Sequence, residues 1–91
     1  MEITVCVTFY GGKGHLNLTV IPADYDTTGY TSSGCYSYEL KAGQYDLSLE
    51  GVAPPGGLLL EVRDDHEKLI ALKEVKKEGF FQRFLPVVIK R

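Results

Sequence analysis

The sequence predicts an all-β protein, a seven-stranded antiparallel sandwich of two sheets. Three observations support this prediction: apolar and polar residues alternate in short runs, β-branched and aromatic residues are concentrated in those runs, and Gly- or Pro-containing turns separate them. A period of two gives a strand one apolar face and cannot give a helix a coherent one. Repeated short runs of this kind are typical of sandwiches. We expect strands at residues 2–10, 15–21, 35–41, 44–50, 58–63, 67–78 and 80–90.

The first two strands are expected to form a hairpin. Aliphatic residues occupy alternate positions in 2–10 and again in 15–21. Between them lies Gly11–Gly14, and glycine readily adopts the positive φ angles that hairpin turns need. A phosphate-binding loop is excluded, because such a loop requires Ser or Thr after the Lys and a helix beyond it.

A polar segment of thirteen residues, 22–34, follows the second strand. Loops of this length in compact domains are often functional, although part of this one could form a short edge strand. Tyr25 and Tyr30 lie in it beside Asp24 and Asp26. Aromatic rings among small polar groups can bind a sugar or a peptide by stacking and hydrogen bonding. The alternative is that both rings fold back over a sheet edge.

The next two runs are joined by a short turn. In 35–41 the alternation places Tyr36 and Tyr38 inward, and 44–50 has the strictest alternation in the chain. Gly43 and Gly51 bound this second run and are expected to mark its ends. Tyr45 opens its apolar face, so we expect the tyrosine ring to be sealed between the sheets.

The segment 67–78 is ambiguous. As a helix it would have Asp64 as its N-cap, Glu67 completing a capping box and Gly79 after its last turn, giving an α+β fold with a helix at 65–78. We favour a strand, because the preceding runs already commit the domain to sheet. Pro86 interrupts the last run, which places 84–90 at a sheet edge or a bulge.

The run Leu40-x-x-Gly43-x-Tyr45-x-Leu47-x-Leu49-x-Gly51 resembles a pattern in small prealbumin-like and carboxypeptidase-regulatory-like sandwiches of immunoglobulin-like architecture, over residues 40–72 at most. The resemblance implies that Gly43 forms the turn. It also implies that Tyr45 is a buried corner residue whose hydroxyl bonds the main chain. By analogy it implies a non-catalytic accessory or adhesion role.

Composition narrows the classes of function. Ninety-one residues make a single domain, 1–91. The net charge of −2 argues against a nucleic-acid partner, although 67–91 carries seven basic and three acidic side chains. No run approaches the roughly 20 apolar residues of a membrane span. Because no secretory signal opens the chain, we expect cytoplasmic residence by default, or an extracellular or periplasmic one if a signal was removed.

The cysteines and histidines do not form a recognisable chemical site. Cys6 and Cys35 each lie on the face opposite the aliphatic residues of their strands, so a bridge requires those strands to be neighbours. Two cysteines do not make a disulfide framework, and we expect free thiols. His15 and His66 belong to no cluster with metal-ligand spacing. We therefore expect no metal and no cofactor.

The sequence predicts a binding protein rather than an enzyme. Ser, His and Asp occur in no arrangement typical of a catalytic triad, and no nucleophile motif is present. Our leading hypothesis is a non-catalytic module that binds another protein, with an edge such as 84–90 accepting a partner strand. The alternative is a carbohydrate- or small-ligand-binding module that uses the 22–34 loop.

Overall fold

The structure of the protein is a computed structural model that describes residues 1–90. In that range the chain forms eight β-strands and no helix. The strands are β1 (Glu2–Phe9), β2 (His15–Ile21), β3 (Thr28–Tyr30), β4 (Gly34–Glu39), β5 (Gly43–Ala53), β6 (Leu58–Arg63), β7 (Leu69–Val75) and β8 (Gly79–Ile89). The predicted all-β fold is confirmed. The eighth strand is β3, the short edge strand within the long polar segment.

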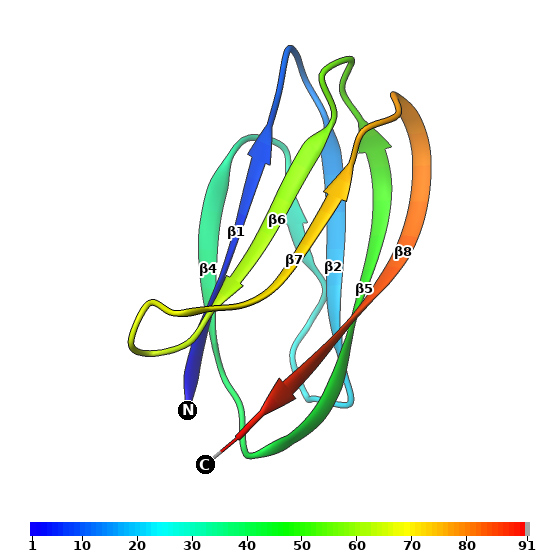
Figure 1. Ribbon diagram of the computed structural model, residues 1–91. Helices are drawn as coiled ribbons and strands as arrows, with labels where there is room; N and C mark the ends of the chain where they lie inside the picture. The colour runs from blue at the N-terminus through cyan, green and yellow to red at the C-terminus, as the bar shows by residue number, and fades with distance from the viewer. Residues whose placement is uncertain (91) are drawn as a thin grey trace.

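The strands make two antiparallel four-stranded sheets, ordered β4-β1-β6-β7 and β3-β2-β5-β8 (Figure 1). The two sheets pack face to face in a body of 38 × 23 × 17 Å. This order gives the sandwich two open sides. We call them the β3–β4 seam and the β7–β8 seam, after the edge strands that border each.

The core lies between the sheets and follows the predicted alternation. Side chains at every second position of the central strands are buried, and directly paired residues share a face, so each sheet presents one apolar layer. Removing this area from water is the main favourable contribution to folding. The fully buried side chains include Ile3, Val5, Leu16, Leu18, Leu47, Leu49, Leu58, Leu60 and Val62.

The strand at 44–50 is longer than expected. It runs from Gly43 to Ala53 and therefore passes through Gly51, which was expected to end it. Gly51 pairs with Leu16, and a Cβ at Gly51 would overlap the carbonyl oxygen of His15. Here the glycine permits close approach of two strands instead of making a turn.

The helical alternative at 65–78 is wrong. Residues 69–75 form β7, which pairs with β6 in antiparallel register apart from an irregularity at Val62/Arg63. Asp64 caps the β6–β7 turn instead of a helix. Its carboxylate accepts the main-chain N–H groups of His66 at 2.8 Å and Lys68 at 2.9 Å. Hydrogen bonds from main-chain amides, chiefly that of Lys68, lower the pKa of the Asp64 carboxyl.

The expectation of free thiols is also wrong, because Cys6 and Cys35 form a disulfide. The two residues lie directly opposite each other in the β1–β4 pair, with Cα atoms 4.1 Å apart. Both were correctly placed on outward faces. The pairing depends on β1 and β4 being neighbours, which local alternation does not reveal.

Two tyrosines differ from their expected burial. Tyr36 was predicted to face the core, but it lies on the edge strand β4 and is 50% exposed. Tyr45 is only partly buried rather than sealed between the sheets. Its hydroxyl donates a hydrogen bond to the main-chain carbonyl of Lys41, 2.8 Å away and four residues upstream. Gly43 lies between them with a φ of 154°, a conformation that favours glycine.

Candidate protein-binding surface

The β3–β4 seam contains the tyrosines that were candidates for ligand binding. Tyr30 is only 2% exposed, and its hydroxyl donates a hydrogen bond to the carbonyl of Val5 over 3.2 Å. The ring of Tyr30 packs edge-on against Tyr36, with centroids 5.0 Å apart. Tyr30 therefore belongs to the core and has almost no surface for a ligand. The ring of Tyr30 folds back over the sheet edge, as in the alternative to ligand binding that the sequence left open.

Tyr25 occupies the rim of the same seam. Its ring packs edge-on against Tyr38 at 5.2 Å between centroids, and its hydroxyl bonds the main chain of Glu39. Tyr38 in turn donates a hydrogen bond to the Thr28 hydroxyl over 2.6 Å. Aromatic pairs and satisfied hydroxyls thus close this side of the sandwich. Burial raises the pKa of Tyr30 well above the usual tyrosine range and also raises the pKa of Tyr38.

The carboxylates of the loop do not converge on a site. Asp24 and Asp26 are both exposed. Within residues 1–90, no group of three or more His, Cys, Asp or Glu side chains could hold a metal ion. Sequence reasoning brought four loop residues together as a candidate site, and the structure places one in the core, one at the rim and two in solvent.

The opposite side of the sandwich has a different surface. β8 is an edge strand, as Pro86 predicted. Four of its inward residues, Phe81, Leu85, Val87 and Ile89, are buried, while Phe80, Phe84 and Val88 on the outer face are 94%, 56% and 51% exposed. These three are the most exposed large hydrophobic residues of the described chain. Because they are spaced by four, all lie on the outer face of one strand. We call Phe80, Phe84, Pro86 and Val88 the β8 stripe.

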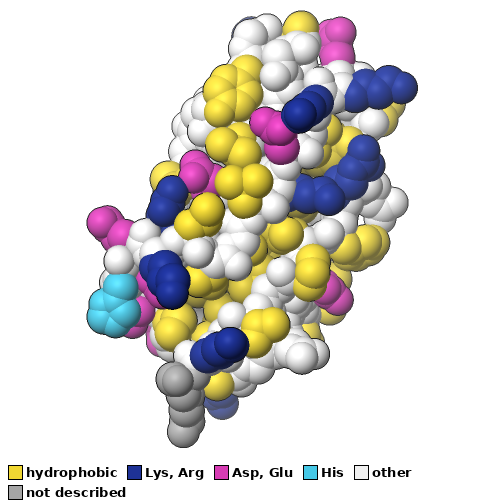
Figure 2. All heavy atoms as spheres, in the orientation of Figure 1, with side chains coloured by type: hydrophobic (Ala, Val, Ile, Leu, Met, Phe, Trp, Pro, Cys, Tyr) yellow, Lys and Arg dark blue, Asp and Glu magenta, His cyan; other side chains and the backbone are white. Residues whose placement is uncertain are grey.

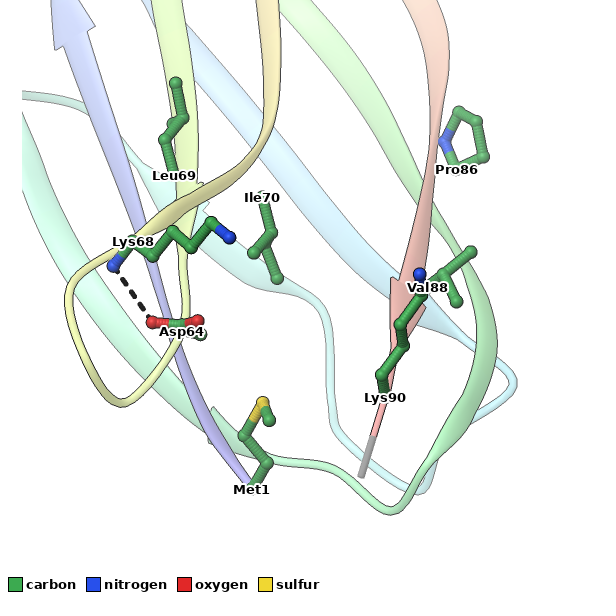
Figure 3. A pocket seen from close by; sticks show the side chains of 8 residues that line it. All are labelled: Met1, Asp64, Lys68, Leu69, Ile70, Pro86, Val88 and Lys90. Carbon is green, nitrogen blue, oxygen red and sulfur yellow. Dashed lines mark hydrogen bonds between the residues drawn. The ribbon is translucent and has the colours of Figure 1, made fainter.

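A groove lies next to the β8 stripe, where β7 and β8 diverge (Figure 1). It has a volume of about 580 Å³. Ile70 and Lys68 extend into the gap from the β7 side, and Val88 and Lys90 lie along β8 on the other side (Figure 3). The complete lining is Met1, Asp64, Lys68, Leu69, Ile70, Pro86, Val88 and Lys90.

The groove lining combines apolar side chains with two lysines, Lys68 and Lys90, and one aspartate, Asp64. Figure 2 shows hydrophobic side chains across this face, with Lys and Arg side chains beside them and several Asp and Glu side chains interspersed. Lys73 pairs with Leu60 and Arg83 with Leu49, so both cations occupy inward-facing positions on edge strands. Inward charges of this kind oppose indiscriminate edge-to-edge pairing.

The sequence indicated parts of this surface but not its assembly. Pro86 marked the edge strand, and the basic balance of 67–91 was visible in the composition. The groove also requires Met1 and Asp64, which are distant in sequence from Val88. Only the pairing of each sheet and the packing of one sheet on the other bring these residues together.

Comparison with protein-family models, with curated proteins and with solved structures finds no match to this chain. In residues 1–90 the structure has no helix that is long and apolar enough to cross a membrane.

Proposed function

We propose that this protein is a non-catalytic interaction module that binds another protein through the β8 stripe. The observation that carries the proposal is the outer face of β8, where Phe80, Phe84 and Val88 are all more than half exposed. Isolated exposed apolar residues are common on protein surfaces, but several on one face of one edge strand mark an interaction site. Burial of these side chains by a partner would be worth roughly 2 kcal/mol each.

The main chain of β8 adds a second means of binding. One side of β8 pairs with β5 along its whole length, and on its other side the described residues contribute no further strand to the sheet. A partner segment could therefore extend the sheet by strand addition. Pro86 has no N–H, so uninterrupted pairing is confined to the part of β8 before it.

The proposal includes the likeness to prealbumin-like and immunoglobulin-like sandwiches. Two antiparallel sheets support it, as does the hydrogen bond from the Tyr45 hydroxyl to the Lys41 carbonyl. The sheets match the architecture of such domains, and a hydrogen bond to the main chain a few residues upstream is the one that their corner tyrosine makes. A non-catalytic accessory role is in keeping with that architecture.

Site-specific photo-crosslinking tests the proposal. A benzophenone amino acid replaces Phe84 in one variant and Tyr36 in another, and each is irradiated in an extract of the native cells. Tyr36 is the matched control, because it is an aromatic residue of similar exposure on an edge strand of the other sheet. We expect a discrete protein adduct at position 84 that disappears when Phe80 and Val88 are also changed to Ser.

Two results would contradict the proposal. One is equal labelling at positions 84 and 36, and the other is no adduct at position 84 from a variant that remains folded. Circular dichroism establishes folding for each variant before irradiation.

A further inference from the structure

We propose that the β7–β8 seam binds an extended protein segment in which apolar side chains alternate with acidic ones. This inference rests on the proposed function and gives the chemical class of the partner. The apolar side chains would cover the β8 stripe and enter the groove. The carboxylates would meet the cations along its borders.

The charge of the seam supports acidic partner residues. Residues 67–90 carry three acidic side chains and six basic ones, and the basic ones are Lys68, Lys73, Lys76, Lys77, Arg83 and Lys90. Within the part of the chain that the structure describes, only one of these six forms an ion pair, Lys76 with Glu74 at 3.5 Å. In this part of the chain the basic side chains therefore outnumber the acidic ones by three, and five of the six cations form no ion pair with another described residue. Complementary charge on a partner speeds association and fixes its register.

The groove contains one carboxylate of its own, that of Asp64. Its oxygen Oδ1 accepts hydrogen bonds from the main-chain amides of His66 and Lys68. Asp64 thus serves the β6–β7 turn and forms no ion pair with either Lys68 or Lys90 in the structure. These two amines border the apolar lining and are placed to receive carboxylates from a ligand.

The shape of the surface indicates an extended segment. The eleven residues of β8 rise roughly 3.3 Å each and so span about 35 Å. Apolar residues recur along this length on one face. Lys68 and Lys90 border the open side of β8, whereas Asp46 and Glu50 of β5 lie on its paired side, opposite Pro86 and Gln82. A strand-like partner of about ten residues matches that length, and its period of two would deliver one face of side chains to the stripe.

A second copy of this chain fits the surface less well. Antiparallel pairing of two β8 strands about Phe84 would place Phe80 of each copy opposite Val88 of the other, which is a good apolar match. The same pairing would bring two basic seams together, and like charges across an interface cost binding energy. It would also place Pro86, which cannot donate a hydrogen bond, in both strands. Charge therefore favours a different, acidic partner.

Peptide binding measured by fluorescence anisotropy tests the inference. The probe is a labelled ten-residue peptide in which Glu alternates with Val, and the reference is the same peptide with Gln in place of Glu. We expect the acidic peptide to bind at least about tenfold more tightly than the neutral one. We also expect its affinity to fall as salt is raised from about 50 to about 300 mM.

Matched variants locate the site. Lys68→Glu is expected to weaken binding of the acidic peptide about tenfold, whereas Lys13→Glu, an equal charge change in the exposed β1–β2 turn, should not. Phe84→Ser should weaken both peptides. If Lys68→Glu fails to fold by circular dichroism, Lys90→Glu replaces it.

The possible outcomes separate this inference from the proposed function. Equal binding of both peptides with loss on Phe84→Ser would overturn the acidic partner and leave a module that binds apolar segments. No binding of either peptide at roughly 1 mM would overturn the inference, while crosslinking at position 84 judges the function independently. Sedimentation velocity tests whether a second copy of the chain covers the β8 stripe. A dimer that Phe84→Ser abolishes would show that it does and would overturn the inference of an acidic partner.

Discussion

The hydroxyl of Tyr25 bonds both main-chain polar groups of Glu39: it donates to the carbonyl oxygen and accepts from the amide, each over 2.9 Å. Glu39 is the last residue of β4, an edge strand that pairs only with β1. One side chain thus satisfies two groups that a further strand would otherwise pair. The tyrosine-rich segment that the sequence offered as an alternative ligand site thus protects this sheet edge, whereas the open edge of β8 has no such cover among the described residues.

We expect Tyr25→Phe to lower the free energy of unfolding by about 1–2 kcal/mol, because the ring can still pack on Tyr38 but two hydrogen bonds are lost. Hydrogen exchange at the Glu39 amide should accelerate at the same time. Chemical denaturation and amide exchange measure the two effects. The control is Tyr36→Phe, at a half-exposed tyrosine of β4, which should change the free energy of unfolding by less than about 0.5 kcal/mol. Unchanged exchange at Glu39 would mean that Tyr25 does not hold this edge.

The disulfide between Cys6 and Cys35 should contribute substantially to stability. It links residues 29 positions apart, and loop-closure entropy for that separation corresponds to about 3–4 kcal/mol. The double variant Cys6→Ser/Cys35→Ser should lose this amount in urea denaturation. Reductant should lower the wild-type midpoint to that of the variant and leave the variant unchanged. A wild-type midpoint insensitive to reductant would contradict the assignment.

Gly51→Ala should destabilise the protein strongly, by about 3 kcal/mol. The added Cβ would overlap the His15 carbonyl oxygen on the neighbouring strand, and main-chain atoms cannot move aside cheaply. Gly34→Ala is the control, because a Cβ there meets nothing within 4 Å. Thermal unfolding of the two variants provides the comparison. Similar melting temperatures would show that the β2–β5 spacing adjusts more readily than we expect.

Stability should fall in alkali. Burial raises the pKa of Tyr30 above its ordinary value of 10.0, so above that pH the unfolded chain loses a proton that the folded protein retains. The contribution of protonated Tyr30 to the free energy of unfolding is therefore complete below about pH 10, and it is lost as pH rises toward the pKa of Tyr30 in the folded protein. Burial raises the pKa of Tyr38 as well, which adds to the same slope.

Tyr30→Phe isolates this effect. We expect the variant to be about 1 kcal/mol less stable at neutral pH, because the Val5 carbonyl loses its hydrogen bond. Its stability should decline less steeply above pH 10 than that of the wild type. Urea midpoints between pH 7 and pH 11.5 measure the slope. Parallel pH profiles would show that Tyr30 titrates normally in the folded protein.

Local pattern was sufficient to predict the elements of this fold. Strand alternation depends only on neighbouring residues in the chain, so the positions of the strands and the inward faces of β1, β2, β5 and β6 could be predicted correctly. Pro86 identified β8 as an edge strand for the same reason, because its missing N–H is a local property. A strand was predicted in the segment that contains 69–75 because the runs before it all had the alternation of β-strands.

Pairing and packing decided the remainder. Cys6 meets Cys35 because β4 lies beside β1, and Tyr30 is buried because β3 brings it over the core. Gly51 is an interior strand residue only because β2 passes so close to it. The groove that holds Lys68 and Val88 exists because two strands from different sheets border one open side. Alternation fixes which face of a strand is apolar, whereas the choice of neighbouring strand depends on contacts between residues far apart in the sequence.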